Sequence, residues 1–372
     1  AKTFSSGFSD KVTPAAVDAL DSNSLDELMK TCDVVVSTIG PFYLFGTKVL
    51  ESAIRTKTHY IDICDDWEPT QAMLELHQQA EDAGITAIIG AGASPGVSNL
   101  LAVKAITELE TPEEVYTFWG SGGPINQDEG DLDLANESGE PSAATIHWIQ
   151  QLSGTIQVLE NNQLTTSKPL RPVTIDYPGI GSDLCHICGH PEPISLARYY
   201  PTIKQSYNLM NMPSFIIYAL EKSVKDVRDG NSQDVKEAAQ KLCTMLANET
   251  IGALDTAKYL YYLVKDKNRN FLPPMGALAV GTDSTGSRVS VATHLEATAK
   301  VDDMAHQTCI PTAIILKMLT DGVISKRGVL APEACVDPDI FFTHLRPYLD
   351  IHQGFDETNF VKVSKEFHTL PI

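Results

Sequence analysis

Three ionisable side chains follow a predicted strand end or a predicted helix start. Asp65 and Asp66 come just after a predicted strand at 59–64, and adjacent carboxylates repel, which raises one pKa toward the range of a general base. A helix start at 68–69 also favours acidic residues there for purely structural reasons. His147 lies near a helix start at 142–148, where a lone histidine is more often a buried structural residue than an acid or base. We keep Asp65, Asp66 and His147 as catalytic candidates.

The segment Cys-His-Ile-Cys-Gly-His at 185–190 has the residue types of a metal site. Zinc sites normally combine two such pairs from separate places, and haem attachment needs a histidine directly after the second cysteine. This sequence has no second pair. In an extended segment His186, Cys188 and His190 would share one face and Cys185 the other. We predict no metal here.

A glycine-rich loop, Gly-Ala-Gly-Ala-Ser-Pro-Gly at 90–96, follows a predicted strand and precedes a predicted helix at 97–109. By position it resembles a turn that binds a dinucleotide pyrophosphate. A proline interrupts it, however, and no strand ending in Asp or Glu follows about 20 residues later. A tight strand-to-helix turn bordering a cleft is the favoured interpretation.

Bulk composition limits the class of protein. The 372 residues exceed the size of a single core, so we expect two domains. No apolar run approaches the roughly 18 residues of a membrane span, and the first residues do not have the pattern of a secretory signal. Seven scattered cysteines indicate reduced thiols, and the net charge of -20 disfavours nucleic acid and anionic lipid as partners. We therefore expect a soluble cytoplasmic protein that binds neither nucleic acid nor a membrane.

Strands and helices alternate regularly up to about residue 99. We predict strands at 15–20, 33–38, 59–64 and 85–89, and helices at 24–30, 46–56 and 69–83, the first opened by a capping box from Ser24 to Glu27. This alternation predicts an α/β fold with a Rossmann-like, doubly wound parallel sheet. In such a sheet ligands lie beyond the carboxyl ends of the strands, which nominates the loops that start at Asp21, Ser37, Asp62 and Gly90.

The pattern changes after residue 112. Predicted strands at 114–119, 173–177, 276–282 and 288–299 alternate irregularly with helices at 214–228, 232–263 and 311–319, the last ended by Asp321 and Gly322. Asp-Ser-Thr-Gly at 283–286 predicts an antiparallel hairpin. We expect an α+β substrate domain with a mixed or antiparallel sheet.

Several segments in a fixed order resemble the saccharopine dehydrogenase family. They lie at 33–42, 53–62, 83–86, 91–100, 177–179, 189–193, 309–313 and 328–333. Members of that family include saccharopine reductase, lysine 6-dehydrogenase and carboxynorspermidine dehydrogenase. The resemblance implies NAD(P)-dependent hydride transfer at the C–N carbon of an amino acid or an N-substituted amino acid, with NADP or NAD as cofactor.

The resemblance also implies a distribution of roles. Cofactor-binding positions would be Asp21, Ser37, Thr38, Ile39, Gly40, Pro41, Ala91, Gly92 and Ala93. Substrate-binding positions would be Ser94, Pro95, Asn99, Tyr177, His190, Glu192 and Arg198. Among these, Arg198 is suited to clamp a carboxylate, and a structural ion pair is an equally good account of it. The family places His147 toward the cleft.

The resemblance further predicts how the chain is organised. The Rossmann-like domain would cover 1–110 and be joined by 305–345, a substrate and dimerisation domain would cover 111–304, and 346–372 would be a tail. Residues 1–4 would be the end of the family's second helix, so its first nucleotide-binding unit is expected to be missing. A homodimer acting on a small amino-acid-like substrate is expected. A non-catalytic nucleotide-binding or scaffold relative, and a reductase of another substrate class, remain as alternatives.

Overall fold

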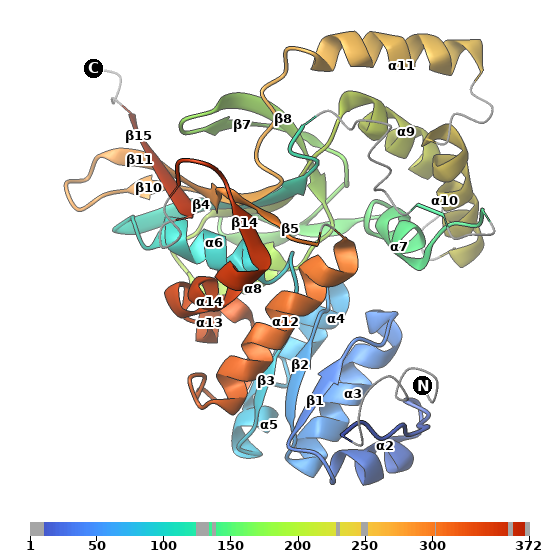
Figure 1. Ribbon diagram of the computed structural model, residues 1–372, viewed down its shortest axis with the longest axis vertical. Coiled ribbons are helices and arrows are strands. Elements are labelled where there is room, and N and C mark those ends of the chain that lie inside the picture. Colours follow the sequence, from blue (N-terminus) through green and yellow to red (C-terminus); the bar gives the residue numbers. More distant parts are fainter. Residues whose placement is uncertain are drawn as a thin grey trace.

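The computed structural model describes residues 11–123, 134–135, 139–227, 231–246, 252–301, 303–355 and 360–368. Residues 1–4, the expected helix end, lie outside this part. The described chain forms a four-stranded sheet, a nine-stranded sheet and a small two-stranded one. Figure 1 shows the four-stranded sheet with its helices in the lower half and the nine-stranded sheet above it. The α/β class, with one parallel and one mixed sheet, is confirmed.

The first sheet is parallel throughout, in the order β1-β2-β3-β13. Its strands are β1 (Val34–Ser37), β2 (His59–Asp62), β3 (Thr86–Ile88) and β13 (Gly328–Leu330). Its helices are α2 (Ser22–Met29), α3 (Phe42–Thr56), α4 (Trp67–Leu74) and α5 (His77–Asp82). Because parallel strands end at one edge, the loops after β1, β2 and β3 meet there, as predicted.

Four local predictions in this region were wrong. Residues 15–20 form no strand: Asp18 instead makes a turn, its carboxylate accepting a hydrogen bond from the Leu20 amide. Helix α2 is capped by Asp21, whose side chain accepts from the Asn23 amide, so Ser24 lies inside the helix.

The helix expected at 69–83 is divided at Leu76, whose backbone leaves the helical region. A long-range contact explains the break. Nδ1 of His77 lies 2.8 Å from the Val329 carbonyl oxygen and ties α5 to β13. Helix α3 also begins at Phe42, four residues before the position expected from the sequence.

The second sheet runs in the order β15-β11-β10-β4-β9-β5-β6, with β8 pairing to β9 and β7 to β8. All its pairings are antiparallel except β4 with β9. Its strands are β4 (Thr111–Gly120), β5 (Ile156–Glu160), β6 (Gln163–Ser167), β7 (Pro172–Tyr177), β8 (Gly181–Cys188), β9 (Gln205–Asn211), β10 (Met275–Thr282), β11 (Arg288–Leu295) and β15 (Val361–His368). The predicted β10–β11 hairpin is confirmed, and the Asp283 carboxylate accepts from the Thr285 and Ser287 amides in its turn.

Two predicted elements in the second half are divided. The strand expected at 288–299 ends at Leu295, and β12 (Ala297–Ala299) pairs instead with β14 (Leu349–Ile351), because the Glu296 amide donates to the Phe360 carbonyl. The helix expected at 232–263 is α10 (Ser232–Leu246) and α11 (Ala253–Asp266), and Gly252 before α11 has an extended backbone.

The remaining helices complete the second half. They are α7 (Ala143–Gln151), α8 (Glu192–Tyr199), α9 (Ser214–Val224), α12 (Met304–Thr320), α13 (Pro332–Cys335) and α14 (Pro338–Leu345). Helix α12 begins earlier than expected, with Asp303 as its N-cap and Pro311 inside it. Residues 346–372, expected as a tail, include β15, which pairs with β11 along its whole length. None of the described helices is long and apolar enough to cross a membrane.

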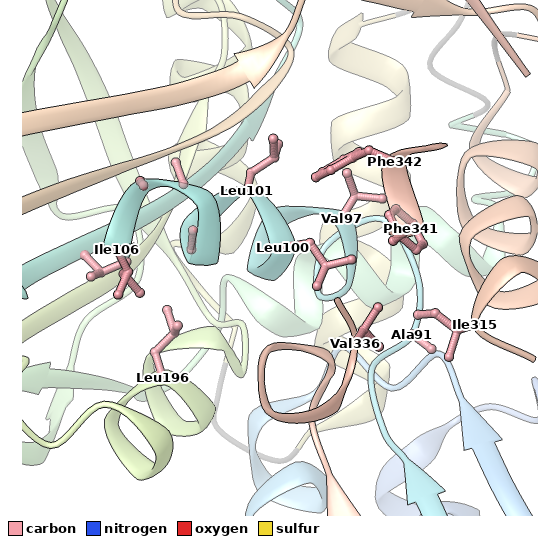
Figure 2. Close-up of a cluster of buried hydrophobic side chains, with 14 of the residues drawn as sticks. Ala91, Val97, Leu100, Leu101, Ile106, Leu196, Ile315, Val336, Phe341 and Phe342 are labelled. Carbon is pink, nitrogen blue, oxygen red and sulfur yellow. The ribbon is translucent and has the colours of Figure 1, made fainter. Parts of the chain in front are cut away.

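Helix α6 (Val97–Ile106) joins the half of the protein that contains the parallel sheet to the half that contains the nine-stranded sheet. It is buried on nearly every side. Every residue of the helix except Lys104 is buried, and the helix packs against the second sheet and against α8, α12, α13 and α14. Figure 2 shows Val97 and Leu100 at one end of the helix, on the side of Phe341 and Val336, with Leu196 near the other end. An all-round apolar helix is the pattern of a core element rather than a surface helix.

Leu100→Ala should lower the free energy of unfolding by about 2 to 5 kcal/mol, because Leu100 is fully buried and the cavity cannot collapse between two halves. The measurement is urea denaturation followed by circular dichroism. Lys104→Ala on the same helix removes a partly exposed ion pair with Asp339 and should cost less than about 1 kcal/mol. Equal losses in the two variants would contradict a core role for α6.

Candidate functional site

Asp62, at the end of β2, holds two of the strand-end loops together. Its Oδ1 accepts hydrogen bonds from the Gly90 amide at 2.8 Å and the Cys64 amide at 3.0 Å, and its Oδ2 accepts from the Tyr60 hydroxyl at 2.8 Å. Burial raises the pKa of Asp62 to about 6 despite these donors. Asp62 was predicted only as the start of a loop, and its structural role follows from a contact 28 residues away.

Helix α7 brings His147 from the second half of the chain onto the loop after β2. Nε2 of His147 lies 3.1 Å from Oδ1 of Asp65 and 3.6 Å from Oδ1 of Asp66. One turn later on α7, Gln151 donates from Nε2 to Oδ2 of Asp65 at 3.2 Å. The structure therefore brings all three catalytic candidates together.

The two aspartates differ in their electrostatics. Burial alone would raise the pKa of Asp65, but the hydrogen bond and charge of His147 hold it below its ordinary value. Burial raises the pKa of Asp66 to about 6, against the opposing charge of His147, and its Oδ2 has no hydrogen-bond partner among the described residues. Burial would lower the pKa of His147, but Asp65 and Asp66 raise it overall. Asp66 thus titrates close to neutral pH, where a general base is effective.

A buried carboxylate, Glu192, is the centre of a second polar group. Its Oε1 accepts from Ser94 at 2.5 Å, from Ser98 at 2.9 Å and from Nδ2 of Asn208 at 2.9 Å. Its Oε2 lies 3.6 Å from Nδ1 of His190. Glu192 is the first residue of α8, and its bond with Ser94 joins this helix start to the 90–96 loop.

His190 connects this group with the aspartates. Burial would lower its pKa, but Cys188 and Glu192 raise it well above the ordinary value. The charge of His190 in turn contributes to the pKa values of Asp65, Asp66 and His147. The two polar groups therefore form one electrostatic cluster. His190 also packs beside the Trp119 ring, with centroids 5.7 Å apart.

Backbone amides at both ends of the 90–96 loop and at the start of α6 are bonded within the chain. Five amides are already bonded: Gly90 to Oδ1 of Asp62, Ala91 to the Asp62 carbonyl, Gly96 to Oδ1 of Asn99, Val97 to the Gly92 carbonyl and Ser98 to the Ala93 carbonyl. Gly96 has φ +126°, and an added Cβ would lie 1.9 Å from the Gly92 carbonyl oxygen. Gly90 and Gly96, both with positive φ, serve a tight turn, which is the favoured interpretation of the sequence.

The positions expected to bind cofactor lie at two places on the strand-end edge. Ser37 is buried at the end of β1, and Thr38, Ile39 and Gly40 are exposed beyond it, before Pro41 and the start of α3. Ala91 and Gly92 are buried and Ala93 is partly exposed after β3. Asp21 is the N-cap of α2.

The expected substrate positions separate into two sets. Ser94, Pro95, Asn99, His190 and Glu192 lie in or next to the polar cluster, although Asn99 is fully buried and bonds Oε2 of Glu333. Tyr177 lies in the core of the second sheet, where its hydroxyl is 3.0 Å from Nδ1 of His294. Arg198 is exposed in the last turn of α8 and has no ion pair with any residue that the structure describes.

The 185–190 segment does not assemble as a metal site. Cys185 and Cys188 are buried in different clusters on opposite faces of β8. Among the described residues, the group with metal-ligand spacing is Asp65, Asp66 and His147, in which the histidine forms an ion pair with each carboxylate.

Sequence reasoning missed Gln151, Asn208, Ser98 and Glu333. Asn208 lies in the buried strand β9 and donates to Glu192, Thr117 and Ser94, while its Oδ1 accepts from the Trp119 indole at 3.0 Å. Strand β9 mixes polar and apolar residues, so no local sequence pattern marked Asn208. Burial raises the pKa of Glu333 to about 7, and it lies just beyond β13 at the same sheet edge.

Comparison with known proteins identifies the family. Residues 1–88 match the model of the saccharopine dehydrogenase NADP binding domain, and residues 92–350 match that of the saccharopine dehydrogenase C-terminal domain. The chain belongs to the saccharopine dehydrogenase family. The resemblance inferred from the sequence is thus confirmed.

The relatives of this chain agree with the family assignment. It is 33% identical over 149 residues to the saccharopine dehydrogenase [NADP(+), L-glutamate-forming] of Pyricularia oryzae and 31% identical over 147 residues to that of Saccharomyces cerevisiae. Each match covers 40% of this chain and 30% of the relative, so the aligned region is less than a third of those proteins. The solved apo structure of the yeast enzyme shares the fold, with a TM-score of 0.58, 18% identity, and coverage of 95% of this chain and 89% of that one.

Asp66→Asn should stabilise the protein at pH 7.5 by up to about 3 kcal/mol. The pKa of Asp66 is about 6 in the folded protein and an ordinary 3.8 in the unfolded chain. Between these pH values the folded protein binds more protons than the unfolded chain. The free energy of unfolding therefore falls as the pH rises through this range. The gain of the variant should therefore shrink as the pH is lowered to 4.5. Urea denaturation at both pH values measures it. Destabilisation by the variant at pH 7.5 would show that the ionised Asp66 is net favourable.

Proposed function

We propose that this protein is an NADP-dependent oxidoreductase that transfers hydride at the C–N carbon of an amino acid or an N-substituted amino acid. The observation that carries the proposal is the joining of Asp65, Asp66 and Glu192 with two histidines at the strand-end edge of the parallel sheet. Groups from both halves of the chain converge there, beside the loops where ligands of such sheets lie.

The choice of NADP rests on the matched NADP binding domain and on the NADP(+) relatives. The residues at this edge fit such a cofactor. Gly40 is exposed, with no atom within 4 Å of an added Cβ, and the start of α3 has no side-chain cap. Residues 37–41 and 91–93 would hold the nicotinamide side of the cofactor.

The proposed chemistry divides between the cofactor and the side chains. Bound at residues 37–41 and 91–93, NADP would supply the hydride acceptor for the C–N carbon in the oxidative direction and the hydride donor in the reductive one. Asp66 takes the proton from the substrate amine as the C=N bond forms, and its pKa of about 6 leaves it ionised at neutral pH. Asp65, itself held by Gln151, fixes the His147 ring, whose positive charge stabilises the ionised Asp66. Water then attacks the imine and releases the amine.

Full-length protein should bind NADPH, with a change in cofactor fluorescence, and should reduce NADP in the presence of amino acids. Asp66→Asn should lower kcat by about 100-fold to 10,000-fold with NADPH binding retained, because only proton transfer is lost. Asp321→Asn, a matched change at an exposed helix end, should leave both readouts unchanged. Absence of NADPH binding would favour the scaffold alternative. Cofactor binding without turnover of any amine would favour a reductase of another substrate class.

We also propose a cytoplasmic location and a homodimer. The seven cysteines are all free thiols, which supports a reducing compartment. The dimer is supported by α11, which lies at the far end of the second half in Figure 1 and exposes a row of large apolar side chains. They are Leu254, Leu260, Tyr261, Leu263 and Val264, with exposed fractions of 46% to 73%. Exposed apolar surface of this kind is typical of a contact between proteins.

The double change Leu260→Glu and Val264→Glu should convert the dimer to a monomer, because it buries two carboxylates in the proposed contact. Light scattering after gel filtration measures the mass. Leu164→Glu, on the exposed side of β6, is the matched control and should leave the dimer intact. A wild-type monomer, or a double variant that remains dimeric, would refute the α11 interface.

A further inference from the structure

Three side chains at the strand-end edge lie at the spacing of metal ligands. Nε2 of His147 is 3.1 Å from Oδ1 of Asp65 and 3.6 Å from Oδ1 of Asp66. Each of these residues offers one ligand atom, and the three atoms all lie within 4.8 Å of one another. In a tetrahedral zinc site the bonds to nitrogen and oxygen are about 2.0 to 2.2 Å long, which places neighbouring ligand atoms roughly 3.3 Å apart. The observed spacing is therefore close to that of three zinc ligands.

The chemistry of the three groups also suits zinc. Zinc is bound by imidazole nitrogen and carboxylate oxygen, and a site with three protein ligands leaves a fourth position for water. Two ionised carboxylates balance the charge of one Zn²⁺ when a neutral imidazole is the third ligand. Magnesium and calcium prefer oxygen ligands, so the presence of His147 disfavours both.

An ion can reach these groups from solvent. The side chains of Asp65 and His147 are 31% and 27% exposed, whereas that of Asp66 is 10% exposed. The second carboxylate oxygen of Asp66, Oδ2, is buried and has no hydrogen-bond partner in the described part of the chain, although buried polar atoms are nearly always satisfied. An ion that enters beside Asp65 and His147 needs no substrate-sized cavity. It gives Asp66 a partner that the described residues do not supply.

Gln151 holds the Asp65 side of the site in place. Its Nε2 lies 3.2 Å from both the backbone oxygen and Oδ2 of Asp65, and these bonds leave Oδ1 for the side of His147. Gln151 lies one turn after His147 on α7, so the same helix supplies one ligand and the group that orients another. Outer partners of this kind fix the ligands in known metal sites.

We propose that Asp65, Asp66 and His147 form a zinc site whose occupancy inhibits the enzyme. Zinc would bond Nε2 of His147 and one oxygen of each aspartate, with water as the fourth ligand, and the His147 proton would pass to solvent. An Asp66 carboxylate bonded to zinc no longer takes a proton from the substrate amine. The inhibition rests on the proposed oxidoreductase function, whereas the zinc site does not. The zinc-free protein is the active form.

The first test is calorimetric titration of the reduced, full-length protein with ZnCl₂. We expect one zinc ion per chain. CoCl₂ in its place should give the visible absorption of a four-coordinate cobalt site. The double change Cys32→Ser and Cys309→Ser removes the exposed thiols, which are alternative zinc ligands, and should leave the binding unchanged. Absence of a saturable site, or its loss in the cysteine variant, overturns the proposal.

The second test removes the groups that would hold the ion. Gln151→Ala keeps all three ligands and should raise the dissociation constant for zinc about 10-fold, because Asp65 is no longer oriented. His147→Ala removes a ligand and should weaken binding further. His306→Ala is the matched control, since His306 pairs with Asp303 at an exposed helix start, and should have no effect.

Circular dichroism establishes that each of these variants folds. Zinc affinity that is unchanged in both His147→Ala and Gln151→Ala would overturn the proposal, as would an equal loss in His306→Ala. If His147→Ala does not fold, Gln151→Ala and the cobalt spectrum of the wild-type protein decide the question.

Turnover distinguishes failure of the zinc site from failure of the proposed function. Zinc should inhibit amine-dependent reduction of NADP over the concentrations at which it binds, and EDTA should restore the rate. Turnover that bound zinc leaves unchanged or increases would overturn the inhibition. Absence of turnover in the EDTA-treated protein would refute the proposed function, and the calorimetric titration would still decide the zinc site.

Discussion

Burial of α6 on all sides is the constraint on which the arrangement of the molecule depends. The helix follows the last loop of the parallel sheet, yet it lies against the mixed sheet on one side and the C-terminal helices on the other. Its first turn carries Ser98 and Asn99, which bond Glu192 and Glu333. Because an apolar helix in this position cannot shift without exposing its whole surface, the two halves hold the polar cluster in register.

The polar cluster is maintained at a cost in stability. Burial raises the pKa values of Asp62 and Asp66 to about 6 and of Glu333 to about 7, so each ionises against the preference of the folded protein at neutral pH. Residues that serve stability alone would be replaced by neutral ones at such positions. Retention of three costly carboxyls at one sheet edge is therefore the expected signature of a site that uses their charge.

The sequence predicts local features of this protein better than distant ones. The parallel strands, the hairpin at 283–286 and the pairing of Asp65 and Asp66 with a strand end all follow from patterns within a few residues. The break at Leu76 and the strand change at Glu296 depend on Val329 and Phe360, far along the chain, and no local pattern contains them. The same holds in the site, where Gln151 and Asn208 acquire their roles only from folding.

The parallel sheet is not continuous in sequence. Its fourth strand, β13, pairs with β3, and the Thr86 hydroxyl bonds the Lys326 carbonyl across 240 residues. On a ribosome, β1 to β3 would emerge long before their neighbour, leaving the edge of β3 unpaired while the whole second half is made. Closure of so large a loop slows folding and exposes a strand edge to other chains. The parallel sheet of the N-terminal half is thus completed only when β13, from the C-terminal part of the chain, pairs with β3.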